Sequence, residues 1–136
     1  MKKLQSALLI LFLSAAIGIV GCKDSEFGNG DIFFCEDVDI YRGAPIDITT
    51  NVSIFTPFYC YIEYQEEFNC TNLYMIRYII DNSQTNIDHT NILLVSNYFS
   101  ATYTPYRLNY PGCYYFEVYK DDFTPIAKSG IIEAVY

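Results

Sequence analysis

The chain has 136 residues and a formal net charge of −8, with 18% aromatic residues that include 14 tyrosines and no tryptophan. This acidic balance excludes nucleic acid as an expected partner, because phosphate binding requires basic surface. The length is that of one ordinary domain with a buried core.

The first 21 residues have the pattern of a secretory signal peptide. Lys2 and Lys3 precede an apolar run that extends to Val20, and charge returns at Lys23. The run is too short for a comfortable membrane span, which needs about 20 apolar residues. We therefore expect residues 1–21 to be removed, which lowers the formal net charge from −8 to −10.

The signal peptide ends in Ile19-Val20-Gly21-Cys22, which resembles the lipobox of bacterial lipoproteins. The resemblance implies cleavage before Cys22 and a lipid on its sulfur, so a membrane is the expected partner. Each buried methylene group contributes about 0.8 kcal/mol, and two or more acyl chains give stable anchoring. The acidic residues that follow Cys22 resemble the export signal of Bacteroidota-type surface lipoproteins. They imply a cell-envelope location in the outer membrane and leave surface exposure open.

Residues 22–30 are polar and contain glycine, which predicts a lipidated flexible tether. The domain then extends over residues 31–136. Its many β-branched and aromatic residues, interrupted by Pro, Gly and Asn clusters, are typical of strands and turns. A spacing of about ten residues favours a sandwich. We expect strands near 32–41, 46–55, 58–66, 72–81, 90–96, 100–109, 113–120 and 126–135.

The segment from Pro111 to Val118 resembles the penultimate strand of immunoglobulin-like or fibronectin-type sandwiches. The resemblance implies that Tyr114, Phe116 and Val118 face the core, with Tyr114 at the tyrosine-corner position. The expected fold is therefore an all-β, immunoglobulin-like antiparallel sandwich of about seven to eight strands. The alternate residues on the same strand, expected to face outward, are Cys113, Tyr115 and Glu117.

Lipidation of Cys22 leaves an even set of four cysteines in a compartment that permits disulfides. Their spacing matches no zinc pattern, so neither a metal nor another cofactor is expected. We predict two disulfides and leave their pairing open, with Cys113 expected to join Cys70 or Cys60. The candidate disulfide cysteines are Cys35, Cys60, Cys70 and Cys113.

No catalytic residue is expected, and the chain is predicted not to be an enzyme. The single histidine, His89, lies in the polar segment from Asn86 to Asn91, which is typical of a loop. The sequence contains no nucleophile elbow and no catalytic cysteine signature.

The excess of tyrosine is the remaining functional signal. Amphipathic rings with few rotamers favour recognition surfaces, although strand interiors use them too. The first hypothesis is a non-catalytic binding or adhesion module for an unidentified glycan or protein. The alternative is a structural accessory subunit of an envelope complex or of a fimbria-like assembly joined by strand exchange. The candidate binding surface comprises Tyr98, Tyr103, Tyr106, Tyr115 and Tyr119.

Overall fold

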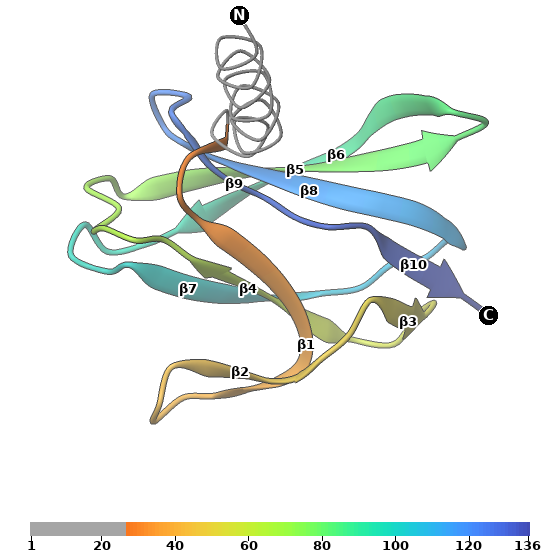
Figure 1. The fold of residues 1–136 in the computed structure, drawn as a ribbon, viewed down its shortest axis with the longest axis horizontal. Helices are drawn as coiled ribbons and strands as arrows, with labels where there is room; N and C mark the ends of the chain where they lie inside the picture. The colour runs from red at the N-terminus through yellow and green to blue at the C-terminus, as the bar shows by residue number, and fades with distance from the viewer. Residues whose placement is uncertain (1–26) are drawn as a thin grey trace, which may run out of the picture.

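A computed structural model describes residues 27–136, which fold into two β-sheets packed face to face (Figure 1). The signal peptide and Cys22 lie outside the described residues. Within residues 27–136, no helix is long and apolar enough to cross a membrane. The four-stranded sheet has the order β2-β1-β4-β7, formed by Ala44–Ile48, Asp31–Asp39, Phe58–Glu63 and Ala101–Tyr106.

The second sheet has six strands, and its main path runs β3-β10-β8-β5-β6. The strand β9 (Pro125–Lys128) also pairs with β8. All pairs are antiparallel except β3 with β10, which is parallel. The other five strands are β3 (Asn51–Ser53), β5 (Asn72–Asp81), β6 (Gln84–Leu94), β8 (Gly112–Lys120) and β10 (Ile132–Val135).

The predicted all-β sandwich is confirmed, with ten strands in place of the expected seven to eight, because two of the expected strands are divided. The stretch 46–55 divides at Thr49, whose hydroxyl donates to the carbonyl of Asn51 at 2.7 Å and accepts from its amide at 3.1 Å. This local turn carries the chain from β2 in one sheet to β3 in the other. The stretch 126–135 divides at Ser129, whose hydroxyl accepts from the amide of Phe116 at 2.8 Å.

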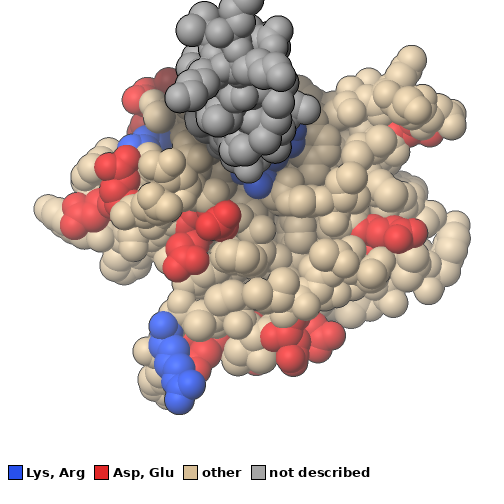
Figure 2. Space-filling model, in the orientation of Figure 1, with Lys and Arg blue, Asp and Glu red and all other residues tan. Residues whose placement is uncertain are grey.

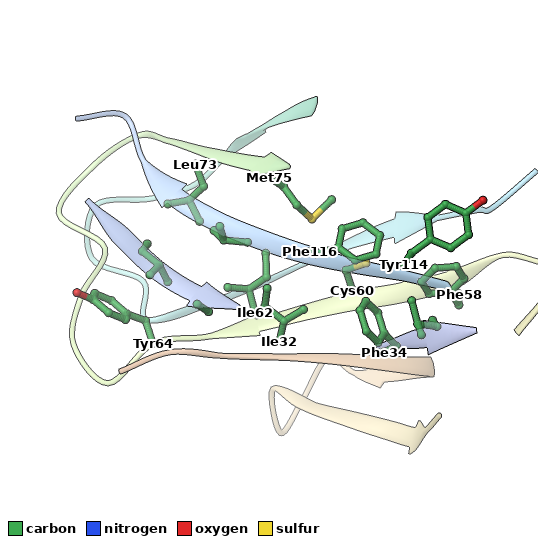
Figure 3. Close-up of a cluster of buried hydrophobic side chains, with 14 of the residues drawn as sticks. Ile32, Phe34, Phe58, Cys60, Ile62, Tyr64, Leu73, Met75, Tyr114 and Phe116 are labelled. Atoms are coloured by element: carbon green, nitrogen blue, oxygen red, sulfur yellow. The ribbon is translucent and has the colours of Figure 1, made fainter. Parts of the chain in front are cut away.

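Strand β8 has the predicted alternation. Tyr114, Phe116 and Val118 are no more than 2% exposed and belong to the core between the sheets (Figure 3). The hydroxyl of Tyr114 donates to the carbonyl of Tyr110 at 2.8 Å, which is the bond that defines a tyrosine corner. In antibody domains the second cysteine lies two residues after this tyrosine; here that position holds Phe116.

The four cysteines of the domain are free thiols, so the two predicted disulfides are not formed. Cys60 pairs with Phe34, and Cys35 pairs with Tyr59 one step along the same two strands. Successive residues of a strand point to opposite faces, so the sulfurs of Cys35 and Cys60 lie on opposite sides of the sheet.

The expected pairings of Cys113 with Cys60 or Cys70 are also excluded. Cys60 belongs to the core, whereas Cys113 alternates with the buried Tyr114 and so faces the outer side of the other sheet. Cys113 pairs with Ile80 at one end of β5, whereas Leu73, near Cys70, pairs with Lys120 at the other end. Cys70 and Cys113 are therefore separated by most of the length of two long strands. No side-chain movement can join cysteines whose Cα atoms are much more than about 7 Å apart.

The segment predicted as the end of the tether is packed against the fold. The amide of Gly30 donates to the carbonyl of Ile126 at 2.9 Å. The ring of Phe27 meets that of Tyr119 edge-on, with centroids 6.3 Å apart. The chain thus joins the domain on the side of β8 and β9, at the top of the view in Figure 1.

Candidate functional site

A pocket of about 330 Å³ opens at the edge of the sandwich, between strand β6 of one sheet and strand β7 of the other. The six-stranded sheet contributes three side chains from its inner side. The other four residues come from the end of β7 and the loop that follows it. The lining consists of Arg77, His89, Asn91, Pro105, Tyr106, Arg107 and Asn109.

Arg77 lies at a position of β5 that faces the core. Leu73 and Met75 on the same strand are buried, and Ile79 packs against the core. By alternation Arg77 shares their face. It pairs with His89 across the strands, and a charged residue facing inward needs partners to offset the cost of desolvation.

Three kinds of contact hold the Arg77 guanidinium. Its Nη2 and Nε lie 2.5 and 2.6 Å from Oδ2 of Asp88. Its Nη1 donates to the hydroxyl of Tyr106 at 3.1 Å. Its central carbon lies 5.5 Å from the ring centroids of both Tyr106 and Tyr114, within the range of cation–π attraction. The side chain is therefore fixed, with 17% of its surface exposed.

A β-bulge supplies the carboxylate. Arg77 pairs with His89 and the next residue, Tyr78, pairs with Ile87, so Asp88 is the extra residue in β6. Bulges re-aim a side chain that regular pairing would direct elsewhere. The residues predicted as a loop around His89 are thus part of a strand, and that prediction is wrong. Polar side chains suit this strand because it lies at an edge of the sheet and is largely exposed.

The charge of the pocket is positive although the protein is acidic. Asp88 offsets the charge of Arg77. Within residues 27–136, Arg107 lies in no salt bridge, and it is exposed. Asn91 and Asn109 add amide donors. Figure 2 shows acidic side chains spread over the visible face and basic ones at only a few points.

Tyr106 forms the wall between the pocket and the core. Its pKa is raised to about 12, chiefly by burial, even though the neighbouring Arg77 charge lowers it. The phenol therefore keeps its proton at neutral pH. It accepts from Arg77 and donates to Oδ1 of Asn91 at 3.5 Å.

The five candidate tyrosines do not form one surface. Tyr106 alone lines the pocket. Tyr98 is 78% exposed in the loop between β6 and β7, and Tyr103 lies on the outer side of the four-stranded sheet beside Tyr59. Tyr115 and Tyr119 lie on the outer side of the six-stranded sheet, as their alternation with Phe116 and Val118 requires.

Sequence reasoning did not select Arg77, Asn91 or Arg107. The available signal was the series Leu73, Met75, Ile79, which leaves position 77 as a charged member of a buried face. The other two residues reach the site only through long-range pairing of β5, β6 and the opposite sheet, which a local pattern does not contain.

Comparison with known proteins gives only a distant likeness. No family model and no curated protein matches the chain. The superoxide reductase (neelaredoxin) from Ignicoccus hospitalis matches at 11% identity with a TM-score of 0.42, covering 63% of this chain and 75% of its own. Two single-residue variants of that protein match at 11% and 12% identity, with TM-scores of 0.44 and 0.42. They cover 81% and 82% of this chain and 82% of their own.

The functional prediction made from the sequence is wrong, because the five candidate tyrosines do not form one surface. The sequence favoured a non-catalytic binding or adhesion module, or a structural or fimbria-like subunit, whereas the matching solved structures are those of a reductase. A likeness of this degree carries no reaction or substrate over to this chain. Among residues 27–136, no group of three or more His, Cys, Asp or Glu could hold a metal ion.

Proposed function

We propose that this protein is a cell-envelope lipoprotein, anchored through Cys22, that binds a small carboxylate- or phosphate-bearing molecule in the pocket between its sheets. The observation that supports this most is the pair of arginines. Arg77 is fixed at a core-facing position, and Arg107 stands at the mouth without a carboxylate partner among the described residues.

The lining fits an anion better than it fits a cation or an apolar ligand. Every polar lining side chain can donate a hydrogen bond, and none of the lining residues is acidic. Arginine presents paired N–H groups that match the geometry of carboxylates and phosphates. A volume near 330 Å³ is at the small end of ligand pockets, so a compact molecule is expected.

The proposal concerns binding at this site. His89 is exposed, and within the described part of the chain it makes no hydrogen bond to a serine, threonine or cysteine side chain. The pocket therefore has charge and shape, but no nucleophile activated by this histidine.

Calorimetric titration of the mature lipoprotein in detergent micelles with inorganic phosphate and with succinate tests the pocket. We expect measurable binding of at least one of them and a loss of about tenfold or more in affinity for Arg107→Ala, because a hydrogen bond to a charged group contributes about 1.5–3 kcal/mol. Arg42→Ala is the matched control, since Arg42 is exposed and pairs with Asp39 in the β1–β2 hairpin. Equal affinity of the two variants, or no binding by the wild type, would contradict the proposal.

The anchor has a separate test. Cells that express the protein should incorporate radiolabelled palmitate into it, and Cys22→Ser should abolish the label. A wild-type protein without label would contradict the anchor and leave the pocket measurements unaffected.

A further inference from the structure

The outer side of the six-stranded sheet carries a continuous set of aromatic and aliphatic side chains. Tyr74 pairs with Ile92 on one side and Tyr119 on the other, and Tyr78 pairs with Ile87 and Tyr115. Residues paired directly across strands point to the same face, so these side chains lie together. The "aromatic face" is defined by Tyr74, Ile76, Tyr78, Ile87, Ile92, Tyr115 and Tyr119.

Rings stack across this face. Tyr78 and Tyr115 are stacked with centroids 4.7 Å apart, and Tyr74 stacks on Phe123 at 5.4 Å. Ile87 and Ile92 are each 63% exposed, and Phe123 is 68% exposed. The half-buried members of the face are Tyr74, Ile76, Tyr78, Tyr115 and Tyr119. Contiguous apolar surface that is open to solvent marks a contact surface for another phase or molecule.

Two charged side chains near the centre of the aromatic face contact its rings, and of these Glu117 is buried whereas Lys128 is exposed. Glu117 is 6% exposed, and its carboxylate accepts hydrogen bonds from Tyr119 and from Tyr78, the latter at 3.2 Å. The ammonium group of Lys128 lies over the ring of Tyr115, 4.8 Å from its centroid. The face therefore consists of rings, phenol hydroxyls and aliphatic side chains, together with the exposed Lys128 and the exposed Thr90, which pairs with Ile76.

The segment that follows the proposed anchor contacts this face. Phe27 packs against Tyr119, and the Lys128 ammonium group also lies 5.2 Å from the Phe27 ring centroid. Only four residues lie between Cys22 and Phe27. Fully extended, the five steps from Cys22 to Phe27 span at most about 17 Å, so a lipid on Cys22 keeps the aromatic face close to the bilayer.

We propose that the aromatic face lies on the membrane surface, with its tyrosine rings in the headgroup layer. This inference rests on the proposed lipid anchor at Cys22. Tyrosine is favoured at this depth because its ring is apolar and its hydroxyl can stay hydrated. The anion pocket opens at the edge of the sandwich between β6 and β7, so it faces along the membrane and stays accessible.

The absence of tryptophan from the chain allows a direct test. Ile92→Trp and Ile87→Trp place single tryptophans on the aromatic face, and Tyr103→Trp places one on the outer side of the four-stranded sheet as the matched control. Each mature lipoprotein is reconstituted in phosphatidylethanolamine–phosphatidylglycerol vesicles with and without brominated acyl chains. Tryptophan emission is excited at a wavelength that tyrosine does not absorb, and flotation of the vesicles is measured in parallel.

We expect brominated lipid to quench Ile92→Trp and Ile87→Trp at least twofold more than Tyr103→Trp. Equal quenching at all three positions, with the protein floating with the vesicles, would overturn the inference and leave the anchor intact. If brominated lipid does not quench Ile92→Trp, and the tryptophan becomes more shielded from solvent as the amount of protein per vesicle rises, then a second copy covers this face. That result would also overturn the inference. Failure to float would overturn the anchor itself, and the membrane contact with it.

Discussion

At the scale of single residues, the buried carboxylate of Glu117 controls the tyrosines around it. Burial, the charge of Glu117 and the hydrogen bond to its carboxylate together raise the pKa of Tyr78 to about 12, and burial is the largest of these causes. The pKa of Tyr119 is raised by the same three causes. The fold thus favours the protonated phenols.

This arrangement predicts a loss of stability at high pH. An unfolded tyrosine ionises near pH 10, so the stabilisation is complete below that pH and is lost as the pH rises toward 12. Glu117→Gln removes the negative charge and should lower the pKa of Tyr78 and Tyr119. Absorbance at 295 nm against pH measures tyrosinate formation directly. Glu36→Gln, on the other sheet, is the control, and an identical titration of both variants would contradict the assignment.

At the scale of elements, the bulge in β6 sets the charge of the pocket. Regular pairing would leave no residue between Ile87 and His89, and the extra Asp88 offsets the Arg77 guanidinium. Asp88→Asn should therefore raise the affinity for inorganic phosphate several-fold, because the competing carboxylate is gone. It should also lower the free energy of unfolding by about 1 kcal/mol or less, since the pair is partly exposed.

The two measurements for Asp88→Asn are calorimetric titration and urea unfolding. Asp81→Asn, at the far end of β5 and in no salt bridge of residues 27–136, is its control. A lower phosphate affinity in Asp88→Asn than in the wild type would show that the carboxylate positions Arg77 for binding and would contradict the predicted sign.

A second element-scale feature is the close approach of the entering chain to both sheets. A Cβ at Gly30 would lie 2.6 Å from the carbonyl oxygen of Ile126 in β9 and 2.9 Å from that of Glu63 in β4. Gly30→Ala should destabilise the fold by about 1–3 kcal/mol, because backbone must move to admit the methyl group. Gly130→Ala is the matched control, since a Cβ there meets nothing within 4 Å. Urea unfolding that gives equal losses for the two would contradict the contact.

The elements also show what the sequence could predict. Local composition and alternation were enough for strand type. The inward side of β8 came from the resemblance to immunoglobulin-like sandwiches, which implied that Tyr114, Phe116 and Val118 face the core. The pocket depended on which strands pair and on a bulge that inserts Asp88, and neither is a local property. The cysteine prediction failed for the same reason. An even count contains no information on whether Cys35 and Cys60 share a face, and the register of β1 with β4 puts them on opposite ones.

At the scale of the whole molecule, the aromatic face and the segment that follows the proposed anchor lie on the same sheet. The hairpin of β1 and β2 belongs to the other sheet and exposes both charged and apolar side chains, including Arg42 and Ile48. The anion pocket lies at the edge between the two sheets. A single orientation at the membrane therefore keeps the anchored segment near the bilayer and the pocket open to solvent. The reason is that the sheet that packs against Phe27 is also the sheet with the aromatic face.

The molecule as a whole also holds its thiols apart, which predicts a stable protein without disulfides. All four cysteines of the domain are free, and Cys35 and Cys60 have no exposed surface. Burial raises the pKa of the Cys60 thiol, so it forms little of the thiolate that reacts. Cys113 is the most accessible of the four, at the start of β8.

The mature lipoprotein in micelles should therefore give one fast-reacting thiol with DTNB when native and four reacting thiols in denaturant without reductant. Cys113→Ser should remove the fast phase, and reductant should leave the urea midpoint unchanged. Fewer than four thiols in denaturant would mean that a bridge forms in the cell, which would require strands β1, β4, β5 and β8 to pair in another register.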